Sequence, residues 1–295
     1  MRELLLASVN AFNLYDGDET ERFARIEALI AGLDADIVAV QEIIARPQEP
    51  GTTDPGKRDL AATRVRRLAT AIDRYCEVDG DVVFAVGGGV HHAALFWRAG
   101  MAPIAGSVRR FERDPAGMWH SFVTCVFAPH GRRMRVGCGQ LSPFDPGLGW
   151  GWRDAGQVLR AMNGDDTPGL AVADWNGFGT DVDYDPDPYP AAEWHPVFAY
   201  QYGPDGTLDR STAYRLERLG RLRDAARITN SAWAPTTGFH PADPHPPRRI
   251  DRWYATHRMP DPAIRSVRVL DHELVGDATD HAPVLLTLDP AQLPE

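Results

Sequence analysis

The stretch ADIVAVQEI, residues 35–43, is a dense apolar run that stops at a carboxylate, Glu42. A short run of this kind is typical of a strand buried on both faces of a sheet. The segment before it, residues 20–33, has apolar residues at helical spacing, and residues 3–12 (ELLLASVNAF) form another apolar run that reaches Asn10. The start of the chain therefore predicts a strand, a helix and a second strand, which is a β–α–β unit.

Similar patterns continue along the rest of the chain. Three further segments have the apolar spacing of helices. We expect helices at residues 58–73 and 152–162, and a mainly helical segment at residues 211–228. Strand-like runs separated by Gly, Pro and charged turns lie at residues 82–88, 91–100, 121–129, 132–141, 169–179, 248–256, 264–274 and 281–290. No internal repeat or linker divides the sequence, so we expect one α/β domain over residues 1–295.

Composition limits the possible function classes. With 43% hydrophobic and 24% charged residues, the 295-residue chain is typical of a globular protein with a sizeable core. Its net charge of −10 disfavours broad, sequence-independent binding of nucleic acid through phosphate contacts. An enzyme that acts on phosphates through metal ions is not excluded, because such sites are themselves acidic.

The N-terminal segment has only a short apolar run before polar residues, without the apolar core of a signal peptide. No apolar run approaches the length of a membrane span. We therefore expect a cytoplasmic protein with no membrane partner. The three cysteines, Cys76, Cys125 and Cys138, are widely spaced and include no CxxC pair, so we expect buried free thiols rather than a zinc site.

Polar side chains recur where the predicted strands end. A single residue of this kind is more often a turn or cap residue. Strand ends can converge on one face of a sheet, however, and here the pattern is repeated over the whole chain at Asn10, Glu42, Asp174, Asn176, Asp251, Asp280 and His281.

These residue types suggest a particular chemistry. Glu42, Asp280 and Asn10 offer hard oxygen ligands, which suit Mg²⁺ or Mn²⁺ rather than zinc. Asp174 could orient or deprotonate a water molecule, and Asn176 could stabilise charge on a phosphate oxygen. A histidine beside a carboxylate can act as acid or base, or hold a phosphate. Together they indicate metal-assisted hydrolysis of a phosphoester.

The order of these residues along the chain resembles that of the motifs of the endonuclease/exonuclease/phosphatase superfamily, whose fold is that of pancreatic-type deoxyribonuclease. Each motif is short, but the ordered set is specific and covers about residues 4–288. The segments that carry the resemblance are LLLASVNAFNL (4–14), ADIVAVQEI (35–43), LAVADWNGF (170–178), RIDRWYAT (249–256) and GDATDHAPVLLTL (276–288).

The resemblance implies a four-layer sandwich, in which two packed, mainly antiparallel β-sheets are flanked by helices and the active site lies at one end. It implies that Glu42 is the principal metal ligand, assisted by Asn10 and Asp280. The implied cofactor is Mg²⁺ or Mn²⁺, and the implied substrate is a phosphoester.

Four other residues receive roles from the resemblance. Asp174 corresponds to the residue that positions or activates the attacking water, and Asn176 to a contact with the phosphate. Asp251 corresponds to the acidic residue that pairs with the catalytic region, and His281 to the histidine near the scissile phosphate.

One departure bears directly on mechanism. The family's Thr-His-Leu strand end is replaced here by Gly139-Gln140-Leu141, so Gln140 stands where the family has a second catalytic histidine. Gln140 can bind substrate by a hydrogen bond but cannot transfer a proton. His91 or His92, in a segment that runs near the site in this family, could compensate, with His92 as a substrate contact; His120 and His195 are weaker candidates.

Three functions remain open at this point. The first is a phosphomonoesterase or phosphodiesterase with an atypical site. The second is an enzyme repurposed for a small-molecule reaction, such as a step of natural-product biosynthesis, which need not be hydrolytic. The Trp-rich loops suggest it, because aromatic side chains in a pocket suit planar ligands. The aromatic residues that suggest it are Trp150, Trp152, Trp175, Tyr184, Tyr189 and Trp194, and of these we expect Trp175 to contact the substrate. The third, a binding module without catalysis, is disfavoured because almost the whole polar set is retained.

Overall fold

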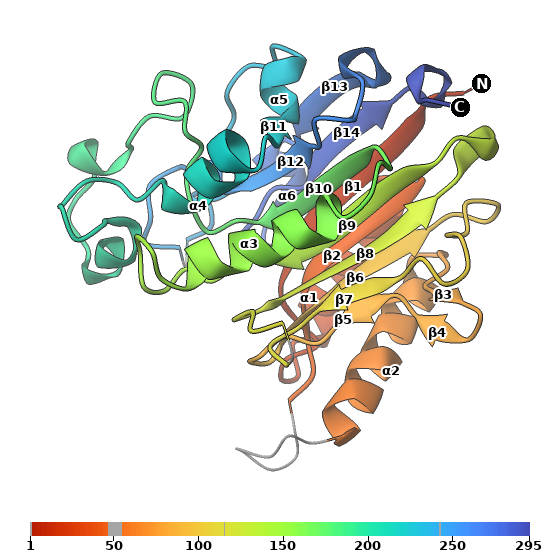
Figure 1. Ribbon diagram of the computed structural model, residues 1–295. Helices are drawn as coiled ribbons and strands as arrows, with labels where there is room; N and C mark the ends of the chain where they lie inside the picture. Colours follow the sequence, from red (N-terminus) through yellow and green to blue (C-terminus); the bar gives the residue numbers. More distant parts are fainter. Residues whose placement is uncertain (1, 47–54, 115, 242) are drawn as a thin grey trace.

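The computed structural model describes residues 2–46, 55–114, 116–241 and 243–295, and its main feature is a pair of six-stranded sheets packed face to face (Figure 1). Listed in spatial order, the first sheet consists of β13 (Ile264–Val269), β14 (Val284–Leu288), β1 (Leu4–Leu14), β2 (Ile37–Ile44), β6 (His91–Trp97) and β5 (Phe84–Ala85). The second consists of β11 (Arg223–Asp224), β12 (Asp251–Ala255), β10 (Gly169–Asp174), β9 (Met134–Gln140), β8 (Ser121–Phe127) and β7 (Arg109–Phe111).

Most neighbouring strands are antiparallel; within the described residues the parallel pairs are β1 with β2 and β9 with β10. A small separate hairpin is made by β3 (Glu77–Val78) and β4 (Asp81–Val82). The mainly antiparallel double sheet that the resemblance implies is therefore confirmed.

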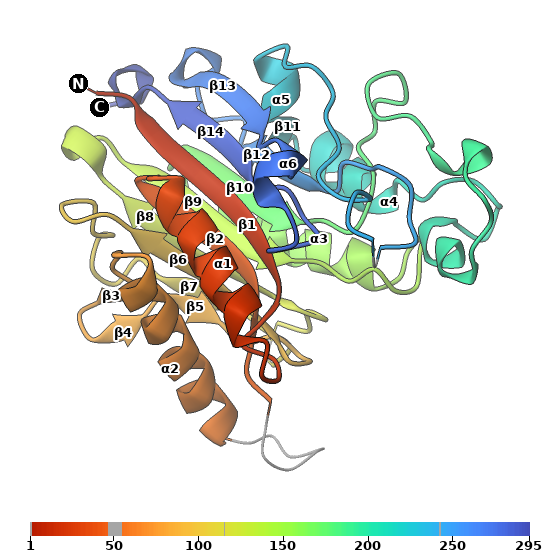
Figure 2. The same cartoon turned by 180° about the vertical axis from the view of Figure 1, so that it is seen from behind.

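Helices cover the outer faces of both sheets. Helices α1 (Thr20–Gly32) and α2 (Pro55–Ala71) lie over the first sheet, which Figure 2 shows from that side, and α3 (Trp150–Met162) lies over the second. The shorter helices are α4 (Ser211–Ala213), α5 (Ala225–Ile228) and α6 (His272–Val275). Short 3₁₀ helices lie at Pro129–Gly131, Tyr189–Ala191, Pro196–Gln201, Asp261–Ala263 and Pro290–Gln292, and a π-helical segment lies at Tyr214–Leu219. No described helix has both the length and the apolar character that a bilayer crossing requires.

Three apolar clusters hold these layers together. The central one lies between the sheets and includes Leu6, Leu95, Val136, Trp253 and Leu286, all at most 1% exposed. A second cluster packs α1 and α2 on the first sheet, and a third packs α3 on the second. This order of helix, sheet, sheet and helix is the predicted four-layer sandwich. The three cysteines are buried free thiols, as expected.

The segment of residues 211–228 is mainly helical, as expected, but its helix is interrupted. It forms two short helices and a π-helical segment, with the strand β11 before the second helix. The helical course ends at Gly220, where an added Cβ would lie 2.1 Å from Leu159 Cδ2, and Arg221 has a positive φ of 56°. Pairing of Arg223 and Asp224 with β12 then replaces the helical hydrogen bonds.

The strand registers bring the polar strand ends to one edge. Asn10 pairs with Gln41, next to Glu42, in the first sheet. In the second sheet, Asp174 pairs with Gln140 on one side and with Asp251 on the other. This edge lies at the end of the sandwich away from the chain termini (Figures 1 and 2).

Candidate active site

Glu42 projects into the site from an irregularity in β2. The pairing of β2 with β6 shifts register between Val40 and Ile43, and Glu42 has a φ of 61°, which is uncommon for a residue other than glycine. Its Oε1 accepts hydrogen bonds from Asn10 Nδ2 at 3.1 Å and Gln140 Nε2 at 2.8 Å. Its Oε2 accepts a bond from the main-chain N–H of Asn13 at 3.0 Å. These donors fix the carboxylate in one orientation.

Asp174, the last residue of β10, faces Glu42 across the same space. Its Oδ2 accepts bonds from Asn10 Nδ2 and Gln140 Nε2, both at 3.2 Å, and from Asn176 Nδ2 at 3.1 Å. Its Oδ1 accepts a bond from the N–H of Asn176 at 3.0 Å. Burial raises the pKa of Asp174 to about 7, and the charge of Asp251 adds to this increase.

Asn10 and Gln140 therefore each donate to both carboxylates. Asn10 is held in turn, because its Oδ1 accepts a bond from the N–H of Phe12 at 3.1 Å and its carbonyl accepts one from Thr279 Oγ1 at 2.6 Å. The second contact joins the loop before β14 to β1. These two amide groups link Glu42 of the first sheet to Asp174 of the second.

A histidine–carboxylate pair forms the other part of the site. His281 Nδ1 lies 2.7 Å from Asp251 Oδ2 and donates a hydrogen bond to it, while Nε2 lies 3.9 Å from Asp280 Oδ1. Burial alone would lower the pKa of His281, but the charges of Asp251 and Asp280 raise it well above its usual value. Burial raises the pKa of Asp280 to about 6; the charge of Glu42 adds to this effect and that of His281 opposes it.

Some of these residues fit a divalent cation by their chemistry. Glu42 and Asp280 offer hard carboxylate oxygens, and buried Asp280 Oδ1 has no hydrogen-bond partner among the described residues. A cation would offset the repulsion that contributes to the raised pKa of Asp280. Across the ranges described, no group of three or more His, Cys, Asp or Glu side chains is placed to hold a metal ion. Asn10, the third predicted metal ligand, instead directs its amide nitrogen at Glu42 and Asp174.

Two of the three predicted substrate contacts point into the interior. His92 is 1% exposed; its Nδ1 accepts a bond from the N–H of Gly87 at 3.0 Å, and its Nε2 lies 3.3 Å from the carbonyl of Ala45. Burial lowers the pKa of His92 to about 3. Trp175 is also 1% exposed and donates from Nε1 to the carbonyl of Arg252 at 2.9 Å. The structure brings Gln140, but neither of these rings, to the group of carboxylates.

Two other histidines, His91 and His120, interact with the charge of Glu42. His91 Nε2 is 2.8 Å from Asn13 Oδ1, and Asn13 in turn bonds Glu42. The ring of His91 lies 5.5 Å from that of His120, whose buried Nδ1 has no hydrogen-bond partner among the described residues. His120 directly precedes Ser121, which pairs with Gln140. Asn13 was not predicted; its only sequence signal is that it follows Asn10 by three residues.

The comparisons with known proteins agree with this geometry at the level of the fold. No protein-family model matches the chain, and no curated protein matches it. Several solved structures match it. An endonuclease/exonuclease/phosphatase from Beutenbergia cavernae DSM 12333 superimposes with a TM-score of 0.56 at 20% identity, over 98% of this chain and 72% of that one.

The chain has the endonuclease/exonuclease/phosphatase fold.

Two further structures with this fold match over nearly the full length of both chains. A mannosyl-6-phosphatase from Bacteroides thetaiotaomicron VPI-5482 has a TM-score of 0.59 at 15% identity, over 97% of this chain and 100% of that one. The human Nocturnin catalytic domain with bound sulfate has a TM-score of 0.54 at 12% identity, over 97% and 94%. The segments that carry the sequence resemblance lie on β1, β2, β10, β12 and the loop leading into β14, all of which border the candidate site.

Proposed function

We propose that this chain is a divalent-metal-dependent phosphoesterase with an atypical active site. The observation that carries the proposal is the convergence of Glu42, Asp174 and the His281–Asp251 pair at one end of the sandwich. A mannosyl-6-phosphatase and a protein described as an endonuclease/exonuclease/phosphatase have the same fold, which supports the same reaction class.

Glu42 and Asp280 would hold Mg²⁺ or Mn²⁺, and the ion would supply charge stabilisation and an acidified water. Asp174 accepts the proton of the attacking water; a carboxylate with a pKa near 7 is well suited to act as a general base at neutral pH. His281, oriented by Asp251, presents a protonated Nε2 to an oxygen of the phosphate. This contact stabilises the charge that develops there.

Asn176 has a supporting role in this arrangement. Its Nδ2 donates to Asp174 Oδ2 and to the carbonyl of Leu141 at 2.9 Å, so both amide hydrogens are already used. We infer that Asn176 positions Asp174, and that the phosphate contact expected from the resemblance would require this side chain to turn.

Gln140 is the feature that supports a second candidate function. Its Nε2 lies between Glu42 and Asp174, while its buried Oε1 has no hydrogen-bond partner among the described residues. Gln140 thus offers an acceptor to a substrate N–H or O–H group but no transferable proton. A site of this kind also suits a repurposed, small-molecule reaction that is not hydrolytic.

The test is the release of product from a phosphomonoester and a phosphodiester in the presence of Mg²⁺ or Mn²⁺. We expect turnover by the wild type and a loss of about 10²-fold or more in Asp174→Asn, which removes the general base. Glu77→Gln, which neutralises an exposed carboxylate on β3 paired with Arg66, is the matched control and should keep full activity.

Two results would count against this assignment. Full activity in Asp174→Asn would remove the proposed base from the mechanism. Tight Mn²⁺ binding without turnover of either ester would favour the repurposed enzyme instead. Gln140→His then separates the cases, since a large gain in phosphoesterase activity shows that the ancestral chemistry is intact, whereas no gain indicates a reorganised site.

A further inference from the structure

Four partly exposed aromatic rings form a continuous ridge beside the candidate site. The aromatic ridge consists of Trp119, Phe144, Trp150 and Tyr200. Trp119 contacts Trp150 at 5.3 Å and Phe144 at 5.5 Å between ring centroids, and Phe144 contacts Tyr200 at 5.6 Å. Phe144 is 39% exposed and Tyr200 is 50% exposed. Apolar surface left open to water in this way often marks a binding site.

The ridge is built on the segments that carry the site. Trp119 directly precedes His120, and Phe144 follows Gln140 by four residues. Phe144 and Tyr200 of the ridge line the same small hollow as Asn176, whose side chain donates a hydrogen bond to Asp174. The ridge therefore lies next to the candidate site.

A buried carboxylate fixes the two loops of the ridge to each other. Asp154 of α3 is fully buried, and its oxygens accept bonds from the N–H of Trp119 at 3.0 Å and the N–H of Ser142 at 3.1 Å. The rings are thus held in place by the fold, and preorganised rings lose little conformational freedom when they bind.

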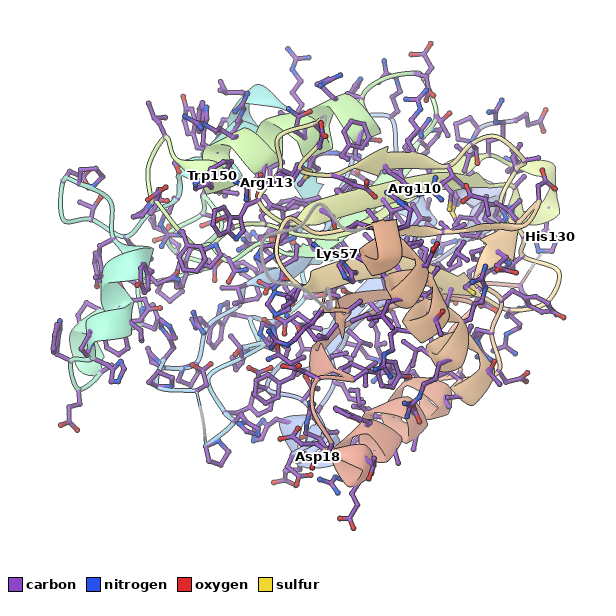
Figure 3. All side chains as sticks on the ribbon, turned by 90° about the horizontal axis from the view of Figure 1, so that it is seen from below. Asp18, Lys57, Arg110, Arg113, His130 and Trp150 are labelled. Atoms are coloured by element: carbon purple, nitrogen blue, oxygen red, sulfur yellow. The ribbon has the colours of Figure 1, made fainter. Side chains whose placement is uncertain are left out.

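Two guanidinium groups lie against Trp150, the indole at one end of the ridge. The Arg113 guanidinium lies 5.6 Å from the Trp150 ring and 5.4 Å from the Trp119 ring, and that of Arg153 lies 5.4 Å from the Trp150 ring. Figure 3 shows Arg113 and Trp150 side by side. Neither arginine forms an ion pair with a carboxylate in the part of the chain that the structure describes. In a protein of net charge −10, two such cations at one place favour an anionic ligand.

From these observations we propose that the aromatic ridge is the leaving-group subsite, and that the substrate is a small phosphoester whose alcohol carries a planar aromatic ring. Trp150 and Trp119 stack on that ring, and Arg113 and Arg153 attract the negative charge of the ligand. The inference rests on the proposed function, since it assigns the substrate class of the same site.

The test compares benzyl phosphate with propyl phosphate, or the dibenzyl and dipropyl diesters if the enzyme acts on diesters. Both alcohols are primary, so the pairs differ mainly in the ring. In Trp150→Leu we expect kcat/KM for the benzyl ester to fall about tenfold more than for the propyl ester, because one stacking contact is lost. Tyr75→Leu is the matched control: Tyr75 is 59% exposed and pairs with Trp97, at the end of β6 away from His91.

The outcomes separate the two proposals. Equal loss on both esters, or the same preference in Trp150→Leu as in Tyr75→Leu, overturns the subsite while the phosphoesterase stands. A dimer that becomes monomeric in Trp150→Leu with unchanged preference shows that the ridge is a subunit contact instead.

If no ester is turned over, the binding of benzyl phosphate is measured by tryptophan fluorescence. Saturable quenching that Trp150→Leu weakens supports the subsite, and the absence of quenching overturns it. Adenosine 5′-monophosphate, as a further substrate, distinguishes a nucleobase from an aryl group.

Discussion

Replacing Gln140 with glutamate tests the bridge between the two sheets at the candidate site. The substitution keeps the size of the side chain but puts a carboxylate oxygen where Nε2 now lies, 2.8 Å from Glu42 Oε1 and 3.2 Å from Asp174 Oδ2. Two donated hydrogen bonds are lost, and like charges take their place. With charge centres about 4 Å apart and an effective dielectric constant of about 20, one such pair costs about 4 kcal/mol.

We therefore expect Gln140→Glu to lower the free energy of unfolding by about 3–5 kcal/mol at pH 8, measured by urea denaturation. The folded state raises the pKa of the new carboxyl above its value in the unfolded chain. The destabilisation is thus absent below the unfolded pKa and appears as pH rises toward the folded pKa. Added Mn²⁺ should restore stability, because a cation between carboxylates replaces the lost donors.

Gln157→Glu is the matched control for this experiment. It makes the same chemical change on the surface of α3, beside Arg160, and should alter stability by less than about 0.5 kcal/mol. If Gln140→Glu unfolds at the same urea concentration as the wild type at pH 8, the amide nitrogen does not lie between the two carboxylates and the reasoning fails.

Two further predictions concern stability. The pKa of His92 is about 3 in the folded protein, against about 6.5 in an unfolded chain, so its contribution is complete above pH 6.5 and is lost as pH falls. Between pH 6 and pH 5 the loss is about 1 kcal/mol, and urea denaturation of His92→Phe should show a pH dependence shallower by that amount; an unchanged slope would contradict the buried neutral ring. Asp185→Ala leaves buried Arg252, now 2.9 Å from Asp185 Oδ2, and nearby Arg249 without this carboxylate. It should destabilise the protein by about 3–5 kcal/mol in the same assay, and a change below about 1 kcal/mol would show that this ion pair contributes little.

The sequence predicted most of the fold because its short apolar runs and helical segments are locally consistent. The segment of residues 211–228 is mainly helical as predicted, but the break in its helix was not foreseen. Its apolar spacing is helical, but Gly220 packs against Leu159, and Arg221 adopts a positive φ. Such tertiary constraints override local propensity, and a single sequence does not display them.

The candidate site was predictable to the extent that its residues lie at or near strand ends. Asn10, Glu42, Asp174 and Asp251 meet because the strand registers bring these ends to one edge. The choice between His91 and His92 depends instead on register, since neighbouring residues of a strand point to opposite faces.

The position of Gln140 was predicted from motif order, but its contacts were not. Its amide links Glu42 to Asp174 because one sheet packs on the other. Contacts of this kind join segments that lie far apart in the sequence, and no local pattern encodes them.

The most direct test of the central claim is a Mn²⁺ titration of the purified protein, because it does not require the substrate to be known. We expect the wild type to bind Mn²⁺ at a single site by calorimetry, and Glu42→Gln to weaken that binding by at least about tenfold. The control Glu77→Gln should bind as the wild type does. A wild type that binds no Mn²⁺, or a Glu42→Gln variant that binds it equally well, would contradict the assignment of a metal-dependent site at this end of the sandwich.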